Sequence, residues 1–155
     1  MEAIEPAVTN SSSNPSVDIL ELGSGTGIFG ESLSRYVLSC SSSETATPIS
    51  AFSLRPRRLV SAEPAPELYA KMRSKYAELQ PSMSQRLTME TLEARSESVP
   101  LPVSCARAVL CANSLHWFSN EESMREIHRL LMPNGILGTL RTSSGSRLLT
   151  SIFIL

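Results

Sequence analysis

The sequence predicts an α/β fold with a Rossmann-like, mostly parallel sheet and flanking helices. Short apolar segments of strand length recur along the chain, and segments with helical periodicity separate them. Glycines, acids or amides directly follow several of the apolar segments. Because the ligands of parallel sheets bind at the carboxyl ends of the strands, we expect these residues to form one site.

Residues 17–22 form the first expected strand, because nearly every position is apolar, as in a strand that is buried on both faces. Gly23, Gly25 and Gly27 follow at alternate positions and lead into an expected helix at 28–38. Glycines permit a sharp turn and let backbone N–H groups approach a ligand closely. The sequence therefore predicts a strand, a tight turn and a helix N-terminus that face a ligand.

The remaining elements alternate along the chain. We expect strands at 59–62, 86–90, 108–112 and 136–140, and helices at 66–79 and from a Ser119/Glu122 capping box to Met132.

These elements predict a core domain at 17–140, between a flexible, polar leader at 1–16 and an atypical tail at 141–155. A Ser-rich insertion at 39–57 has neither helical nor strand periodicity. Such a long loop is unusual in a compact α/β unit, which leaves three alternatives. The insertion is a surface loop, a disordered segment or an artefact of the gene model.

Composition argues against several classes of function. The 155 residues suit one domain, and the net charge of −1 lacks the basic excess of nucleic-acid-binding proteins. The 3 cysteines lack metal-ligand spacing, which favours thiols in a reducing compartment over disulfides or a metal site. No signal peptide is evident, and the apolar run at 148–155 is far shorter than the ~20 residues of a membrane span. We therefore expect a cytoplasmic protein with no metal, nucleic-acid or membrane partner.

Two classes of ligand suit the glycine turn. Gly25, Gly27 and Gly30 fit the G-x-G-x-x-G pattern of dinucleotide sites, which predicts an NAD-dependent oxidoreductase as one alternative. Glu21 ends the strand beside the turn, however, and a carboxylate there favours a cationic or amine-bearing ligand over a pyrophosphate. S-adenosylmethionine (SAM) has a sulfonium, an ammonium group and no phosphate, so it fits the second pattern.

Four motifs resemble, in the expected order, those of one enzyme family. Residues 21–27 resemble motif I of the class I SAM-dependent methyltransferases. The other three resemble the methyltransferase type 11, trans-aconitate methyltransferase-like branch: Val-x-x-Glu-Pro at 60–64, Ser-Glu before Val-Pro-Leu-Pro at 96–102, and Leu-His-Trp-Phe at 115–118.

The resemblance implies SAM as the cofactor, and it implies a set of binding residues: Glu21, Gly23, Ser24, Gly25, Gly27, Glu63, Pro64, Ser96, Glu97, Asn113 and Ser114. Glu21 and the glycines would hold the methionine part, and Glu97 would recognise the adenine. An acid at the end of the second strand binds both ribose hydroxyls in many nucleoside sites, which is the role we expect for Glu63.

The family further implies in-line methyl transfer to a small-molecule acceptor. Such a transfer requires mainly that donor and acceptor are held in line and dry, so a dedicated catalytic residue is optional. His116 follows the fourth expected strand and could act as a base or polar contact for the acceptor, since an ordinary histidine titrates near neutral pH. The alternative is that His116 and Trp117 are packing residues that shape the floor of the pocket.

The sequence departs from the family pattern after the fifth expected strand. Family members continue through two more strands, so we expect a truncated form, either active or inactive. The fifth strand would then have an exposed edge that pairs with another chain, unless the tail at 148–155 covers part of it. A non-catalytic pseudo-methyltransferase that serves as a partner subunit is therefore a further alternative.

Overall fold

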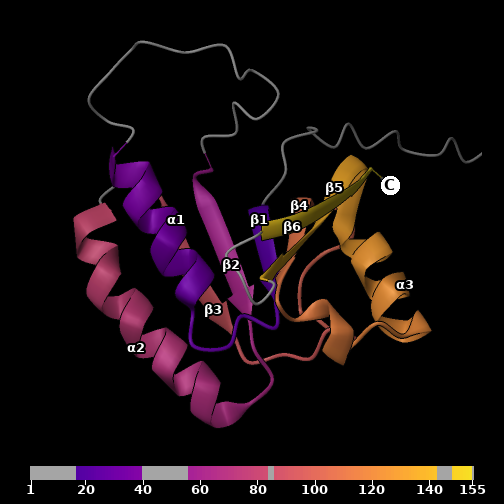
Figure 1. Cartoon of the computed structure of the whole chain (residues 1–155), viewed down its shortest axis with the longest axis horizontal. Helices are drawn as coiled ribbons and strands as arrows, with labels where there is room; N and C mark the ends of the chain where they lie inside the picture. Colours follow the sequence, from indigo (N-terminus) through magenta and orange to yellow (C-terminus); the bar gives the residue numbers. More distant parts are fainter. Residues whose placement is uncertain (1–16, 40–55, 84–85, 143–147, 155) are drawn as a thin grey trace, which may run out of the picture.

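The computed structural model describes residues 17–39, 56–83, 86–142 and 148–154 (Figure 1). The predicted leader at 1–16, most of the Ser-rich insertion and Cys40 lie outside the described residues. The described chain forms a 6-stranded sheet with the strand order β3-β2-β1-β4-β5-β6. Strands β1 to β5 pair in parallel and β6 pairs antiparallel with β5, so the predicted mostly parallel sheet is confirmed. Among these residues, no helix is long and apolar enough to span a membrane.

The elements alternate as the sequence predicts. In chain order they are β1 (Val17–Leu22), α1 (Ile28–Ser39), β2 (Arg58–Ala62), α2 (Pro66–Met83), β3 (Thr88–Leu92), β4 (Ala106–Ala112), the 3-10 helix η1 (Leu115–Trp117), α3 (Glu121–Leu130), β5 (Leu131–Thr142) and β6 (Leu148–Ile154).

Two apolar cores lie on opposite faces of the sheet. Helices α1 and α2 cover one face and α3 covers the other (Figure 1). Successive side chains of a strand point to opposite faces, so Ile19 packs in the α1 and α2 core whereas Leu20 packs in the α3 core. This double burial explains why β1 is apolar at nearly every position.

Helix α3 begins one residue later than the sequence predicts. Asn120, and not Ser119, is the N-cap: its backbone is extended and its side-chain oxygen accepts a 2.8 Å hydrogen bond from Ser123 N. Both residue types cap helices well, so the local sequence does not decide between them. The helix ends at Leu130, and β5 begins at once because Leu131 is already extended. The predicted end of this helix at Met132 is therefore wrong.

The tail covers the edge of the fifth strand, which is the alternative to a bare edge that the sequence left open. Residues 148–154 form β6 and pair antiparallel with residues 136–142 of β5 through 7 consecutive residue pairs. The run at 148–154 is rich in β-branched and aromatic residues, which suit a strand. Among the described residues, β6 and not β5 is therefore the last strand on this side of the sheet.

Candidate functional site

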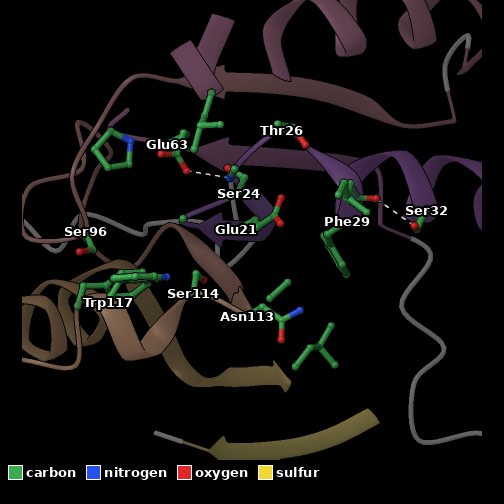
Figure 2. Close-up of a pocket in the computed structure, with 18 residues that line it drawn as sticks. Glu21, Ser24, Thr26, Phe29, Ser32, Glu63, Ser96, Asn113, Ser114 and Trp117 are labelled. Atoms are coloured by element: carbon green, nitrogen blue, oxygen red, sulfur yellow. Dashed lines mark hydrogen bonds between the residues drawn. The ribbon is translucent and has the colours of Figure 1, made fainter. Parts of the chain in front are cut away.

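A pocket of about 720 Å³ lies at the carboxyl ends of β1, β2 and β4, where the parallel sheet is expected to bind its ligand (Figure 2). It brings together most of the residues that the sequence predicts for the site: Glu21, Gly23, Ser24, Gly25, Glu63, Pro64, Ser96, Asn113 and Ser114. Among the residues that the structure describes, no cluster of His, Cys, Asp or Glu could hold a metal ion.

The glycine turn forms one wall of this pocket. Gly25 has a φ of +57°, and a Cβ added there would meet no atom within 4 Å. Gly23 has a φ of +66°, but a Cβ added there would lie 2.6 Å from Ser114 Cβ. Gly23 is therefore needed for close packing as well as for the turn. The open space beside Gly25 lets a ligand approach the backbone there.

Glu63 links β2 to the glycine turn. Its side chain is 5% exposed, and its carboxylate accepts hydrogen bonds from Gly25 N at 2.8 Å and Ala65 N at 3.0 Å. The two bonds use different oxygens, so each oxygen keeps a lone pair for a ligand hydroxyl. Glu63 is thus oriented by the backbone on both sides and still able to accept two further hydrogen bonds.

Glu21 places a second carboxyl group in the pocket. It is 1% exposed and accepts a 2.8 Å hydrogen bond from Ser61 Oγ. Burial, assisted by the negative charge of Glu63, raises the pKa of Glu21 to about 7. None of the described residues that line the pocket is Lys, Arg or His. The pocket therefore offers negative charge and no positive charge to a ligand, which suits a cation.

Two predicted site residues support the walls through their hydroxyls. Ser24 Oγ donates a 2.8 Å hydrogen bond to the carbonyl oxygen of Ala62, and Ser114 Oγ donates one of 2.6 Å to that of Leu22. Both bonds join neighbouring strand ends. Asn113 precedes Ser114 and has a φ of +55°, a conformation that asparagine tolerates better than most residues. Ser24 and Ser114 therefore join the strand ends that form the walls of the pocket.

Three predicted site residues do not line this pocket. Gly27 packs against α2, where an added Cβ would lie 2.9 Å from Tyr76 Cε1. Glu97 is partly exposed and accepts a 3.1 Å hydrogen bond from Asn120 Nδ2, which lowers its pKa. His116 is exposed and lies 4.8 Å from Trp117 between ring centroids. It lines a smaller hollow of about 350 Å³ that shares Asn113, Ser114 and Leu140 with the main pocket.

The pocket also has an apolar wall, of which only Trp117 is expected from the sequence, as a residue that shapes the pocket floor. Ile28, Phe29, Leu68, Trp117, Phe118 and Leu140 belong to it, and Ile28 is 66% and Trp117 81% exposed. Ile28 directly follows the glycine turn, so its place in the first turn of α1 could have indicated a position facing the site. Trp117 is part of the 115–118 motif and lies at the pocket in Figure 2.

A family described as a methyltransferase domain matches residues 38–139, which is more than half of the chain. The chain belongs to this family. Together with the relatives below, the match identifies a class I SAM-dependent methyltransferase domain, which confirms the resemblance of the four motifs. The matched segment of the methyltransferase domain begins after the glycine turn and includes Glu63, Ser96 and Asn113.

An uncharacterised methyltransferase-like protein of Schizosaccharomyces pombe is 33% identical to the methyltransferase domain over 120 residues. The match covers 77% of this chain and 36% of that protein, so the chain spans about a third of this relative.

Solved structures of other proteins are similar in fold, among them a methyltransferase and a cyclase. A SAM-dependent methyltransferase from Aquifex aeolicus has a TM-score of 0.60 and 18% identity, over 88% of this chain and 62% of its own. The [4+2]-cyclase SpnF has a TM-score of 0.58 and 23% identity, over 86% of this chain and 43% of its own. Because a cyclase shares the fold, the fold of the methyltransferase domain does not by itself identify the reaction.

Proposed function

We propose that the pocket binds SAM and that the protein transfers the methyl group of SAM to a small-molecule acceptor. The observation that carries this proposal is the pair of buried carboxyl groups, Glu21 and Glu63, in a pocket whose described lining has no basic residue. A sulfonium and an ammonium group are stabilised by such a pair, whereas a pyrophosphate is repelled. The charge therefore favours SAM over the dinucleotide of the oxidoreductase alternative.

Each part of SAM has suitable partners in the pocket. Glu63 would accept hydrogen bonds from the two ribose hydroxyls through the lone pairs that its backbone partners leave open. Glu21 and the backbone at Gly23 and Gly25 would hold the methionine part. Ser96 and Pro64 would lie toward the adenine. Glu97 is held by Asn120 beside the pocket, so its contact with the base would require it to turn away from the helix cap.

Bound SAM would supply a methyl group activated by the sulfonium. The chain would then orient this group and exclude water from it, which is sufficient for an in-line displacement. Ile28 and Phe29 from α1 and Leu140 from β5 provide the apolar wall for this purpose. The adjoining hollow, with His116 on its rim, is where we place the acceptor. His116 would contact the acceptor as a base or a hydrogen-bond partner.

Calorimetric titration of the chain with SAM, with S-adenosylhomocysteine and with NADH tests the proposal. We expect binding of the first two in the micromolar range and no binding of NADH. Binding of NADH without SAM would instead support the oxidoreductase alternative. A folded, monodisperse sample that binds neither ligand would contradict the cofactor site and favour a non-catalytic partner subunit.

A further inference from the structure

We propose that Ser61 and Tyr76 are positioning residues for Glu21, and that binding of the cationic cofactor releases one proton from Glu21 through this arrangement. We call the three residues the Tyr76–Ser61–Glu21 chain. The proposal rests on the cofactor site proposed above. It concerns two residues, one on β2 and one on α2, that do not line the pocket themselves.

When Glu21 is ionised, the hydrogen bonds of the Tyr76–Ser61–Glu21 chain have one possible direction. Ser61 Oγ donates to Glu21 Oε2 at 2.8 Å, and Ser61 Oγ lies 2.8 Å from Tyr76 Oη. A serine hydroxyl has one proton, so when Ser61 donates to Glu21, Tyr76 must donate to Ser61. All three residues are buried, and Tyr76 is only 2% exposed. Water therefore does not compete for these bonds, and the ionised carboxylate is stabilised by two hydroxyls in series.

The same three oxygens also accommodate a protonated Glu21. The carboxyl group then donates to Ser61 and Ser61 donates to Tyr76, so each of the three oxygens keeps a hydrogen-bond partner, and only the Tyr76 hydroxyl proton has no acceptor among them. The Tyr76–Ser61–Glu21 chain can therefore hold Glu21 at the same place in both protonation states. A buried carboxyl group that has hydrogen-bond partners in only one of its two protonation states would have to move when it gains or loses its proton.

The fold makes room for the Tyr76 ring and hydroxyl at two positions without a side chain, one in the glycine turn and one on α1. A Cβ added to Gly30 would lie 1.8 Å from Tyr76 Oη, and one added to Gly27 would lie 2.9 Å from Tyr76 Cε1. Both glycines belong to the pattern that first suggested a dinucleotide site. Here their lack of a side chain is explained by the approach of Tyr76 from α2, which places its hydroxyl next to Ser61.

The surrounding charges favour proton release on binding of a cation. The titratable groups that interact with Glu21 are Glu63 after β2, Tyr76 on α2 and Cys111 on β4, and none of them is positive. Burial, assisted by the charge on Glu63, raises the pKa of Glu21 to about 7. A sulfonium or ammonium beside Glu21 favours the ionised carboxylate, so the carboxyl O–H bond breaks and the proton passes to the buffer.

Calorimetric titration of the full chain with SAM, in pairs of buffers of different ionisation enthalpy, measures the released proton directly. At pH 6 we expect release of nearly one proton per SAM bound, and at pH 8 almost none. The dissociation constant should fall about tenfold from pH 6 to pH 8, because only the ionised form binds tightly. Glu21→Gln should remove both the proton release and the pH dependence.

The positioning role of Ser61 and Tyr76 is tested by the pH midpoint at which the affinity for SAM changes. Ser61→Ala and Tyr76→Phe each remove a hydroxyl that stabilises the carboxylate, so the midpoint should move to higher pH, more for Ser61→Ala. Ser34→Ala on α1 and Tyr69→Phe on α2 are matched controls, because neither residue belongs to the Tyr76–Ser61–Glu21 chain. Both variants should leave the midpoint of the pH dependence of SAM affinity unchanged. A merely structural role would lower affinity equally at every pH.

The outcomes separate this inference from the proposed function. Binding of SAM that is independent of pH and releases no proton overturns the inference and leaves the cofactor site intact. Absence of any binding at pH 8, where Glu21 is ionised, overturns both. The measurement on the unsubstituted chain decides the proton release even if one of the variants does not fold.

Discussion

Glu63 orients the glycine turn and lines the pocket at the same time. Glu63→Ala removes the acceptor of Gly25 N as well as the expected ribose contact. We expect SAM affinity to fall by about 1 to 3 kcal/mol, as for a lost charge-assisted hydrogen-bond site. Calorimetric titration measures this change, with Glu67→Ala in the first turn of α2 as an acidic control outside the pocket. An unchanged affinity would remove Glu63 from the site.

Burial of Glu21 also predicts an effect on stability in the absence of ligand. Its pKa is about 7 in the folded chain against an ordinary value of 4.5, so the folded state holds a proton that the unfolded state loses between these pH values. Its contribution to the free energy of unfolding is therefore full below pH 4.5 and is lost as the pH rises through about 7. At ~1.4 kcal/mol per pH unit the loss is about 3 kcal/mol.

Other carboxylates make the free energy of unfolding change with pH in the opposite direction. We therefore compare the Glu21→Gln variant with the unsubstituted chain at each pH. The pKa values of Glu31, Glu97 and Glu126 are lowered by their hydrogen-bond partners. Glu21→Gln keeps these groups and removes only the titration of Glu21. In urea unfolding at a series of pH values, the variant should gain stability relative to the unsubstituted chain as the pH rises from 5 to 8. A constant difference would show that Glu21 titrates normally.

The contact between α1 and α2 at Gly30 reverses the usual effect of an alanine in a helix. Gly to Ala in a helix interior ordinarily stabilises by about 1 kcal/mol. At Gly30 the new Cβ would lie 1.8 Å from Tyr76 Oη, so we expect Gly30→Ala to destabilise by about 1 to 3 kcal/mol. Combination with Tyr76→Ala should be much less costly than the sum of the two single changes in urea unfolding. Additive effects would mean that these residues do not touch.

The N-terminus of α3 offers a direct choice between two neighbouring caps. Asn120→Ala removes the acceptor of Ser123 N and should destabilise the chain by about 1 kcal/mol. Ser119→Ala should change stability by less than about 0.5 kcal/mol, since Ser119 makes no capping bond. Urea unfolding of the two variants decides between them. A larger loss of stability for Ser119→Ala than for Asn120→Ala would support Ser119 as the N-cap, as the sequence predicts.

The elements were predictable where the signal is local. The apolar runs at 17–22 and 108–112 are strands because both faces are buried, and Glu21 and Glu63 could be assigned to one site because they end neighbouring strands. Glu97 follows a loop of irregular backbone, and its side chain turns to Asn120, which no spacing in the sequence indicates. The hydroxyl chain from Tyr76 to Glu21 was equally hidden, because it joins residues 15 and 40 positions apart.

At the scale of the whole molecule, the tail was the part that the sequence left open. Whether a segment at the edge of a sheet forms a strand depends on the neighbouring strand with which it pairs. The local sequence of 148–154 does not show that β5 is this neighbour. The parallel part of the sheet carries the pocket at its carboxyl edge, while β6 pairs on the side of β5 away from β4. For this reason the local sequence could not decide between a bare fifth strand and one that the tail covers, and the structure shows the second.

The pairing of β6 on one side only can be tested with two adjacent prolines. Neighbouring residues of a strand direct their N–H groups to opposite sides, so of Ser151 and Ile152 one N–H faces β5 and the other faces the open edge. Proline removes the N–H, and edge strands tolerate it only on the open side. We expect one of Ser151→Pro and Ile152→Pro to lower the free energy of unfolding by about 1 to 3 kcal/mol more than the other. Equal, small effects would mean that β6 does not pair with β5, and equal, large effects would mean that a further strand covers its outer edge.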